Sequence, residues 1–183
     1  MDRVRIGIVG MGIGRFHAGY LLEGKVQRAE LTAVCDIEPR AIEDFKGRLQ
    51  TFTDSDALIQ SGFVDAVIIG TPHYQHTTIG IAALRAGLHV LVEKPISAHK
   101  VDGERLVAAH RNRKQVFAVM FQERTSPRFR KIKDLIQNNE LGVIRRVNWT
   151  VTNWFRTNAY YASSGWRATW AGEGGGVLLN QCP

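Results

Sequence analysis

Residues 4–17 read VRIGIVGMGIGRFH, and this stretch decides the fold. Its first six residues are mostly apolar, which predicts a buried strand. Gly10, Gly12 and Gly14 follow at once and lead into a predicted helix. Strand, glycine turn and helix are the context in which a loop cradles phosphate, because the free N–H groups and the positive dipole end of the helix face the anion. The spacing G-x-G-x-G is one residue shorter than the dinucleotide fingerprint, so the loop alone is a weak indication.

A second apolar run, residues 31–35, ends at Asp36, 24 residues after Gly12. An acid at the tip of the second strand can accept hydrogen bonds from the adenosine ribose hydroxyls and would repel a 2′-phosphate. This favours NAD over NADP as cofactor. Arg40 lies one helical turn later and could pair with such a phosphate, so NADP stays open as the lesser alternative. Asp36 also suits the N-cap of a helix predicted over residues 38–49.

Apolar strands and amphipathic helices alternate along the next eighty residues. Further strands are predicted at residues 51–53, 64–69, 88–92 and 116–121. Helices are predicted from residue 55 and over residues 75–86 and 101–113. Because continuous apolar strands that alternate with helices form parallel sheets, the sequence predicts an α/β fold with a doubly wound, Rossmann-type sheet.

The strand predicted at residues 88–92 ends in Glu93-Lys94-Pro95. Pro95 has no N–H to give to a neighbouring strand, so the strand stops there. Ligands of an open parallel sheet bind beyond the carboxyl ends of its strands, where Lys94 would stand. Position alone favours an ordinary surface lysine, but the surrounding strand and helix pattern and Asp36 favour a functional one.

The pattern changes after Gln122. Residues 127–137 predict a basic amphipathic helix. Residues 143–155 alternate apolar and polar side chains, which predicts a strand of a mixed or antiparallel sheet with one buried face. The sequence therefore predicts a Rossmann domain over residues 1–122 and an incomplete α+β domain of open-sheet type over residues 123–183. The predicted strand has no neighbours in the second domain, so we expect it to pair with another copy or to be disordered.

Composition and charge exclude several classes of protein. The net charge of +7 comes from residues 111–183, which carry 12 basic and 4 acidic side chains. These charges lie mainly on one helix with acids nearby, which argues against a nucleic-acid partner. No apolar run reaches the roughly 20 residues of a membrane span, and two cysteines give neither a disulfide framework nor a metal site. We expect a cytoplasmic protein without a metal ion and without a membrane partner.

Several short motifs accompany the glycine turn and Asp36. They are Thr71-Pro72-x-x-x-His76, Glu93-Lys94-Pro95, Gln122-x-Arg124 and Trp166-Arg167 ahead of a triple glycine. Together they resemble the Gfo/Idh/MocA family, the relatives of glucose-fructose oxidoreductase and inositol dehydrogenase. The resemblance implies a Rossmann domain, a C-terminal domain built on a large open sheet, and NAD(P)-dependent oxidation of sugars, inositols or similar polyols. It also implies a homo-oligomer, a dimer or tetramer, formed through the C-terminal sheet.

The resemblance, with the arguments above, gives a set of candidate site residues. Cofactor contacts are expected at Gly10, Gly12, Ile13, Gly14, Asp36, Arg40, Thr71, Pro72, His73, His76, Glu93 and Lys94. Substrate contacts are expected at Lys94, Arg124, Tyr160, Trp166, Arg167 and Asn180. His73 stands where the family usually has asparagine, and the resemblance implies a cis Lys94–Pro95 bond. It also places a catalytic histidine four residues after Asn180, one residue past Pro183, so we expect a chain truncated within its C-terminal domain.

Two functions remain open at this point. The first is an NAD(P)-dependent dehydrogenase in which Lys94 orients a substrate hydroxyl and takes or relays its proton. In this interpretation His73 and His76 are packing residues and not proton-transfer groups. The second is an NAD-binding protein without turnover.

Overall fold

The computed structural model describes residues 3–150, 152 and 155–181. Contacts between residues divide the chain into two units, Met1–Met120 together with Trp166–Pro183, and Phe121–Gly165. The first unit holds the whole sheet and also the last segment of the chain. The predicted domain limits, residues 1–122 and 123–183, therefore stay a prediction, because the contact units follow a different division.

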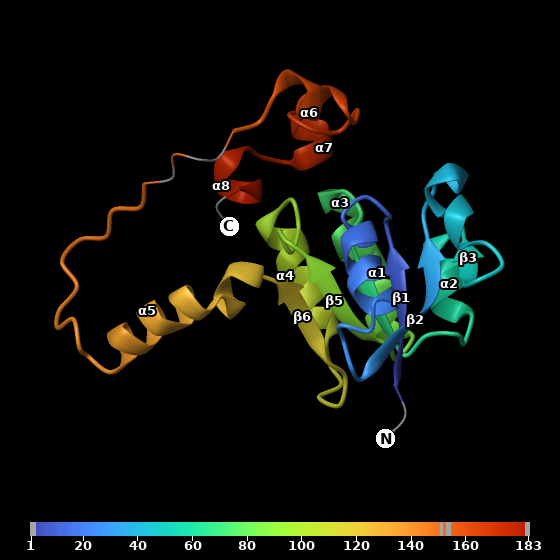
Figure 1. Ribbon diagram of the computed structural model, residues 1–183, viewed down its shortest axis with the longest axis horizontal. Helices are drawn as coiled ribbons and strands as arrows, with labels where there is room; N and C mark the ends of the chain where they lie inside the picture. The colour runs from blue at the N-terminus through green and yellow to red at the C-terminus, as the bar shows by residue number, and fades with distance from the viewer. Residues whose placement is uncertain (1–2, 151, 153–154, 182–183) are drawn as a thin grey trace. The chain divides into compact units, whose positions relative to one another are not determined.

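A six-stranded parallel sheet forms the centre of the first unit, as predicted (Figure 1). Its strands are β1 (Val4–Val9), β2 (Ala29–Cys35), β3 (Gln50–Phe52), β4 (Ala66–Ile69), β5 (His89–Glu93) and β6 (Phe117–Met120). The strand order is β3-β2-β1-β4-β5-β6, and every pair is parallel. The order reverses between β1 and β4, which is the switch point where open α/β sheets bind ligands.

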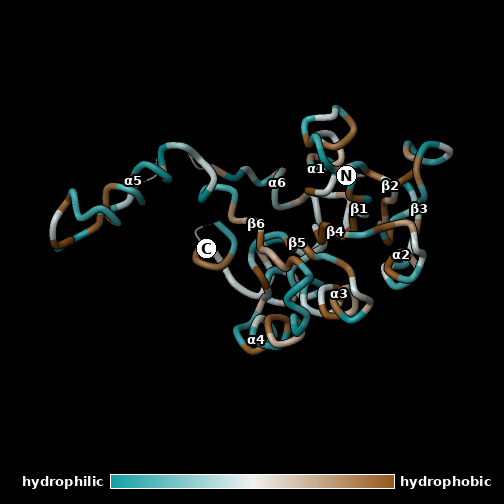
Figure 2. Tube along the Cα trace, turned by 90° about the horizontal axis from the view of Figure 1, so that it is seen from below, coloured by the Kyte–Doolittle hydropathy of each residue, from teal (hydrophilic) through white to brown (hydrophobic). Residues whose placement is uncertain are grey.

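Helices cover the two faces of this sheet unequally. The first unit contains α1 (Gly14–Leu22), η1 (Pro39–Phe45), α2 (Ser55–Gln60), α3 (His73–Arg85), α4 (Lys100–Ala109), α7 (Trp170–Glu173) and α8 (Val177–Asn180). Figure 2 shows α1 on one side of the sheet and α2, α3 and α4 on the other. The larger apolar core lies on the α2, α3 and α4 side and includes Val67, Val90 and Leu106, each at most 2% exposed. The smaller core lies under α1, around Ile8 and Val34.

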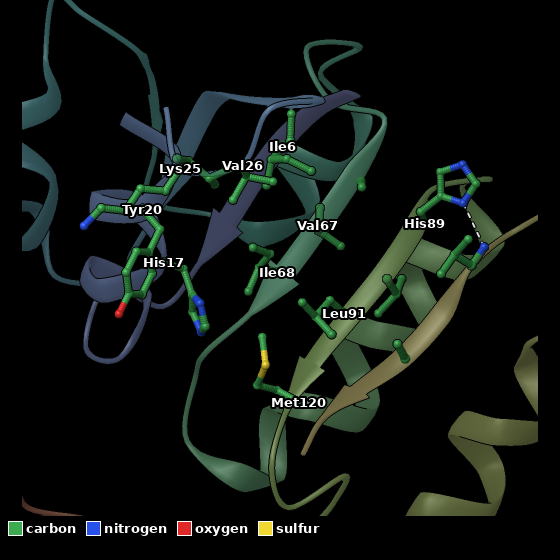
Figure 3. Close-up of a pocket in the computed structure, with 16 residues that line it drawn as sticks. Ile6, His17, Tyr20, Lys25, Val26, Val67, Ile68, His89, Leu91 and Met120 are labelled. Atoms are coloured by element: carbon green, nitrogen blue, oxygen red, sulfur yellow. Dashed lines mark hydrogen bonds between the residues drawn. The ribbon is translucent and has the colours of Figure 1, made fainter. Parts of the chain in front are cut away.

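The α1 face of the sheet is left open beside β4, β5 and β6. A cavity of about 510 Å³ lies there, and Figure 3 shows His17 and Tyr20 of α1 on one side of it and Leu91 and Met120 on the other. On this side of β5, Leu91 is only half-buried, while Val90 and Val92 are buried. The lining is mainly apolar, which suits a packing partner better than a charged ligand.

Three helices differ from their predicted limits. α4, predicted over residues 101–113, ends at Ala109, because His110 already leaves the helical conformation. η1 is a 3₁₀ helix of seven residues, where residues 38–49 were predicted as a longer helix. Glu38 caps its start, and Gly47, with φ +74°, turns the chain toward β3. α3 begins at His73, two residues earlier than predicted, because Pro72 already holds its N-cap position. His73 and His76 therefore both lie in the first turn of α3, at the carboxyl edge of the sheet.

The second unit contains η2 (Gln122–Thr125), α5 (Pro127–Gln137) and α6 (Asn158–Ala162). The strand predicted at residues 143–155 is wrong for the described part of that segment, residues 143–150, 152 and 155. The described chain offers no neighbouring strand to complete its backbone hydrogen bonds, and a lone strand is not stable in water. Its Trp149 instead stacks on Phe129 of α5, with ring centroids 5.3 Å apart. On the apolar side of the amphipathic helix α5, Ile132 and Ile136 are about half exposed.

Among the described residues, no helix has the length and apolar character that crossing a bilayer requires.

The fold predicts a large effect for Leu106→Ala. Leu106 is fully buried between α4 and α3, so truncation should leave a cavity and lower the free energy of unfolding by about 2–5 kcal/mol. Val107, its neighbour on α4, is 54% exposed, and Val107→Ala should change stability by less than about 0.5 kcal/mol. Urea unfolding followed by circular dichroism measures both. Equal losses in the two variants would contradict this assignment of the core.

Candidate functional site

The glycine turn brings the carboxyl ends of β1 and β4 into close contact. Gly10 has φ +91°, and a Cβ atom there would lie 2.6 Å from the backbone nitrogen of Thr71 and 2.7 Å from the carbonyl carbon of Gly70. Gly14 is equally restricted, since a Cβ atom would lie 2.7 Å from the side chain of Ile8. Both glycines are therefore required by the protein itself, whatever ligand is bound.

Gly12 differs from these two glycines. A Cβ atom at Gly12 would meet nothing within 4 Å, so the fold does not explain why the position lacks a side chain. The N-cap of α1, Ile13, gives no side-chain cap, and the first turn of α1 holds no acid. An uncapped helix start beside open space fits the pyrophosphate of a dinucleotide, which would accept hydrogen bonds from the N–H groups of α1.

Asp36 fixes the glycine turn to the end of β2. Its Oδ2 accepts a hydrogen bond of 2.7 Å from the backbone N–H of Met11, and its Oδ1 accepts one of 2.9 Å from the N–H of Glu38. The N-cap role considered for Asp36 belongs to Glu38, whose side chain accepts from the N–H of Arg40. Asp36 is half-buried at the tip of β2 and Arg40 is exposed, and their contacts with a cofactor stay predictions.

Two carbonyl groups that border the site converge on the ring of His76, which is fully buried. Its Nδ1 lies 2.8 Å from the carbonyl oxygen of Pro95, and its Nε2 lies 2.8 Å from that of Thr71. A neutral imidazole carries a proton on one nitrogen only, so while the His76 ring is uncharged only one of these two contacts is a hydrogen bond. The ring links the end of β4 to the turn after β5. The Thr71 hydroxyl is buried without a hydrogen-bond partner in the described chain, which leaves it available to a ligand.

Burial controls the charge of both histidines in the first turn of α3. It lowers the pKa of His76, and the hydrogen bonds to Pro95 and Thr71 oppose this effect only in part. Burial also lowers the pKa of His73, whose Nδ1 donates to the carbonyl oxygen of Glu173 at 2.8 Å. The His73 ring meets Trp166 edge to face, with centroids 5.2 Å apart. Both residues thus have the packing surroundings expected from the sequence, and their proposed cofactor contacts stay predictions.

Glu93 connects α1 to the lysine corner. Its Oε1 lies 2.8 Å from Nε2 of His17, and its Oε2 accepts from the backbone N–H of Lys94 at 3.2 Å. Both side chains are largely buried, with 10% of Glu93 and 16% of His17 exposed. His17 was missed in the sequence analysis. Its position three residues after Gly14, on the first turn of the helix that starts the site, is the signal that could have found it.

Lys94 stands at the carboxyl end of β5, as predicted, and the Lys94–Pro95 bond is cis, as the resemblance implies. Its ammonium group donates to the main-chain oxygen of Asn180 at 2.6 Å and to Oδ1 of the same residue at 3.0 Å. The structure therefore brings together two predicted residues that are 86 positions apart in the chain.

The other predicted substrate residues fall into two groups. Trp166 and Arg167 belong to the first unit, and the Arg167 guanidinium lies over the Trp166 ring at 4.7 Å from its centroid. Arg124 and Tyr160 belong to the second unit, where Arg124 lies over the ring of Phe121 and Tyr160 under the guanidinium of Arg156.

A buried acid in the last segment of the chain was also missed in the sequence analysis. Glu173 lies between Arg167 and Asn180 in the sequence and is buried in the structure. It directly precedes the triple glycine, and that position is the signal that could have found it.

The acids and histidines of the site do not gather as metal ligands. Over residues 3–150, 152 and 155–181, no group of three or more His, Cys, Asp or Glu side chains could hold a metal ion.

Two family models match the chain. Residues 4–121 match the model of an oxidoreductase family with an NAD-binding Rossmann fold, named GFO_IDH_MocA. Residues 129–183 match the GFO/IDH/MocA C-terminal domain.

Individual relatives agree with these models. Myo-inositol 2-dehydrogenase of Thermotoga maritima is 29% identical over 143 residues, which are 76% of this chain and 42% of that protein. The WlbA dehydrogenase of Bordetella pertussis, solved with NADH and UDP-GlcNAcA, matches 99% of this chain and 54% of its own with a TM-score of 0.85 and 30% identity. The scyllo-inositol dehydrogenase of Lactobacillus casei, solved with NAD(H) and scyllo-inositol, matches 77% and 43% with a TM-score of 0.70 and 30% identity. The chain spans about half the length of such relatives.

The contrast between Gly10 and Gly12 gives a prediction. Gly10→Ala adds a Cβ atom to a position with positive φ and no room, so the free energy of unfolding should fall by more than about 2 kcal/mol. Gly12→Ala meets open space and should change it by less than about 1 kcal/mol. Chemical unfolding of both variants, compared with the unchanged chain, measures the difference. A Gly12→Ala loss as large as that of Gly10→Ala would contradict the geometry.

The lowered pKa values of His73 and His76 predict a pH dependence. In the unfolded chain these histidines bind protons near pH 6.5, whereas in the folded protein they bind them only at lower pH. Their contribution to stability is therefore complete above about pH 6.5 and is lost as the pH falls, by up to about 1.4 kcal/mol per pH unit for each group. Urea unfolding between pH 7.5 and 5 measures the slope. His76→Gln should flatten it, and Val107→Ala should run parallel to the unchanged chain.

Proposed function

We propose that this chain, which belongs to the Gfo/Idh/MocA family of oxidoreductases, binds NAD and transfers hydride between it and a secondary alcohol of a sugar, inositol or similar polyol. The observation that carries the proposal is the placement of Lys94. It stands at the carboxyl edge of the sheet, its ammonium group is bound to Asn180, and Glu93 and His17 connect its strand to the helix that follows the glycine turn.

The chain's own residues account for cofactor binding. The N–H groups at the start of α1 would hold the pyrophosphate, and no side chain intrudes at Gly12. Asp36, already aligned by the N–H of Met11, accepts from the ribose hydroxyls and disfavours a 2′-phosphate, so NAD is preferred to NADP. Thr71 supplies a buried hydroxyl that makes no hydrogen bond within the described chain.

The chemistry at Lys94 follows from its position. Oxidation of a secondary alcohol removes a hydride from carbon and a proton from oxygen. A bound nicotinamide supplies the hydride acceptor. Lys94 orients the substrate hydroxyl by hydrogen bonding to its oxygen. In its neutral amine form it takes or relays the hydroxyl proton, and the ammonium group that forms is held by Asn180. Trp166 and Arg167, in the same unit, are proposed to border the substrate, and Arg124 and Tyr160 are proposed from the family resemblance.

The class of substrate is proposed from the relatives. The inositol dehydrogenases and the WlbA dehydrogenase are named for, or solved with, inositols and a UDP-linked sugar acid. All of these carry vicinal hydroxyls. We propose the same class of substrate for this chain, and compounds of this class form the panel for the test below.

Setting and assembly complete the proposal. The buried Cys35 is a free thiol, which suits the reducing cytoplasm. Burial raises the pKa of this thiol to about 12. Self-association through the second unit is supported by its exposed apolar side chains, among them Val143, Val147 and Trp149.

Lys94→Met tests the proposal. NADH binding, followed by fluorescence, should persist, because the substitution leaves the glycine turn and Asp36 intact. Oxidation of the best alcohol in a panel of inositols, sugars and UDP-sugar acids should fall by about 10²–10⁴-fold. Lys100→Met is the matched control, since Lys100 is 87% exposed on α4, and it should change neither quantity.

Three outcomes separate the functions. Normal turnover by Lys94→Met would overturn the role of Lys94. Binding of NADH by the unchanged chain without oxidation of any alcohol in the panel would favour a binding protein without turnover. Absence of NADH binding at millimolar concentration would contradict both functions.

A further inference from the structure

A buried carboxylate lies behind the Lys94–Asn180 pair. Glu173, the last residue of α7, is 7% exposed. Its Oε1 accepts a hydrogen bond of 2.6 Å from Nδ2 of Asn180, and its Oε2 accepts one of 2.9 Å from the backbone N–H of Ala168. A buried carboxylate without donors is strongly unfavourable, and here each oxygen has one.

The backbone around Glu173 is shaped to hold it. Ala168 has φ +57°, a conformation that side-chain-bearing residues rarely adopt, and its N–H points at Glu173. A Cβ atom at Gly172 would collide with the carbonyl oxygen of Trp166, so this turn closes tightly. The main-chain oxygen of Glu173 in turn accepts from His73 on α3. Glu173 is thereby fixed to the helix that starts beside the site.

The two neighbours of Asn180 determine which way its amide points. An ionised carboxylate only accepts hydrogen bonds and an ammonium group only donates them. With Nδ2 toward Glu173 and Oδ1 toward Lys94, both contacts are favourable. A reversed amide would set oxygen against carboxylate and NH₂ against ammonium. Glu173 and Lys94 are thus connected through one side-chain amide with a single favourable orientation.

We propose that Glu173 is a positioning residue for Lys94: through Asn180 it aims an oxygen at the Lys94 ammonium group and stabilises that group's charged form. The consequence for the reaction rests on the proposed function, because it concerns the lysine that orients the substrate hydroxyl. The arrangement itself does not depend on that function. A carboxylate directly at position 180 would face Glu173 at hydrogen-bond distance, and two such groups cannot both ionise without repulsion.

An exchange of the two side chains tests the proposal. The variants are Glu173→Gln, Asn180→Asp and the double variant E173Q/N180D. Asn180→Asp should be the least stable, because it opposes two carboxylates. The double variant restores one carboxylate and one amide, since the new amide at position 173 can donate to the new carboxylate at position 180, which also accepts from Lys94. Its loss of free energy of unfolding should be much smaller than the sum of the losses in the two single variants, as measured by urea unfolding. Additive effects would overturn the proposal.

A second measurement reads Lys94 itself. With ¹⁵N-labelled lysine, the titration of the Lys94 ammonium group should move to lower pH in Glu173→Gln, by about half to one pKa unit for the loss of a charge two hydrogen bonds away. Glu104→Gln is the matched control, since Glu104 is exposed on α4, and it should leave the titration unchanged. A loss that is merely structural would lower stability and leave the Lys94 titration in place, which would also overturn the proposal.

The unchanged protein gives a third measurement, which needs no variant to fold. The Nδ2 protons of Asn180 should exchange slowly with solvent, and their NMR shifts should follow the titration of the Glu173 carboxyl group. Insensitivity of these shifts to acid would contradict the proposal. NADH binding should stay within about twofold in Glu173→Gln, because the glycine turn is untouched. If the unchanged protein binds no NADH, the proposed function fails while the exchange cycle and the titration still decide the role of Glu173.

Discussion

The close approach of β1 and β4 at Gly10 is the constraint on which the rest of the site depends. A Cβ atom there would overlap the backbone of Gly70 and Thr71, so the two strands can meet only through glycine. The order of the sheet reverses at this point, where open α/β sheets bind ligands beyond the strand ends. Asp36 holds the turn from the β2 side. The start of α1 follows the turn without a side-chain cap.

At this edge of the sheet, buried polar groups are paired mainly with the protein's own backbone. His76 lies between the carbonyl groups of Thr71 and Pro95, and His73 donates to that of Glu173. These contacts favour the observed loop positions, since an unpaired polar group in the interior costs free energy. Beside them Lys94 extends from the end of β5 to Asn180, whose segment returns from the far end of the sequence.

Sequence reasoning succeeded where local pattern and tertiary structure agree. All six strands were predicted close to their observed positions, because continuous apolar runs between glycine and proline signals have few alternatives in a parallel sheet. It failed at residues 143–155, where alternation of side chains predicted a strand. Alternation defines a face but supplies no neighbour, and a strand needs hydrogen bonds from another chain segment. The same holds for α5, whose apolar residues are spaced for burial while Ile132 and Ile136 stay half exposed.

The sequence by itself determined the Rossmann architecture, the glycine turn, Asp36 and the position of Lys94 at the sheet edge, since these follow from short-range periodicity and from the order of strands and helices. Only the tertiary structure decided how that edge is completed. His17 meets Glu93 across 76 positions of the chain, and Glu173 meets Asn180 across the triple glycine. Nothing in local spacing encodes which donor will face which acceptor. Burial, which also depends on the tertiary structure, lowers the pKa of His73 and His76. It also requires a partner for each buried charge.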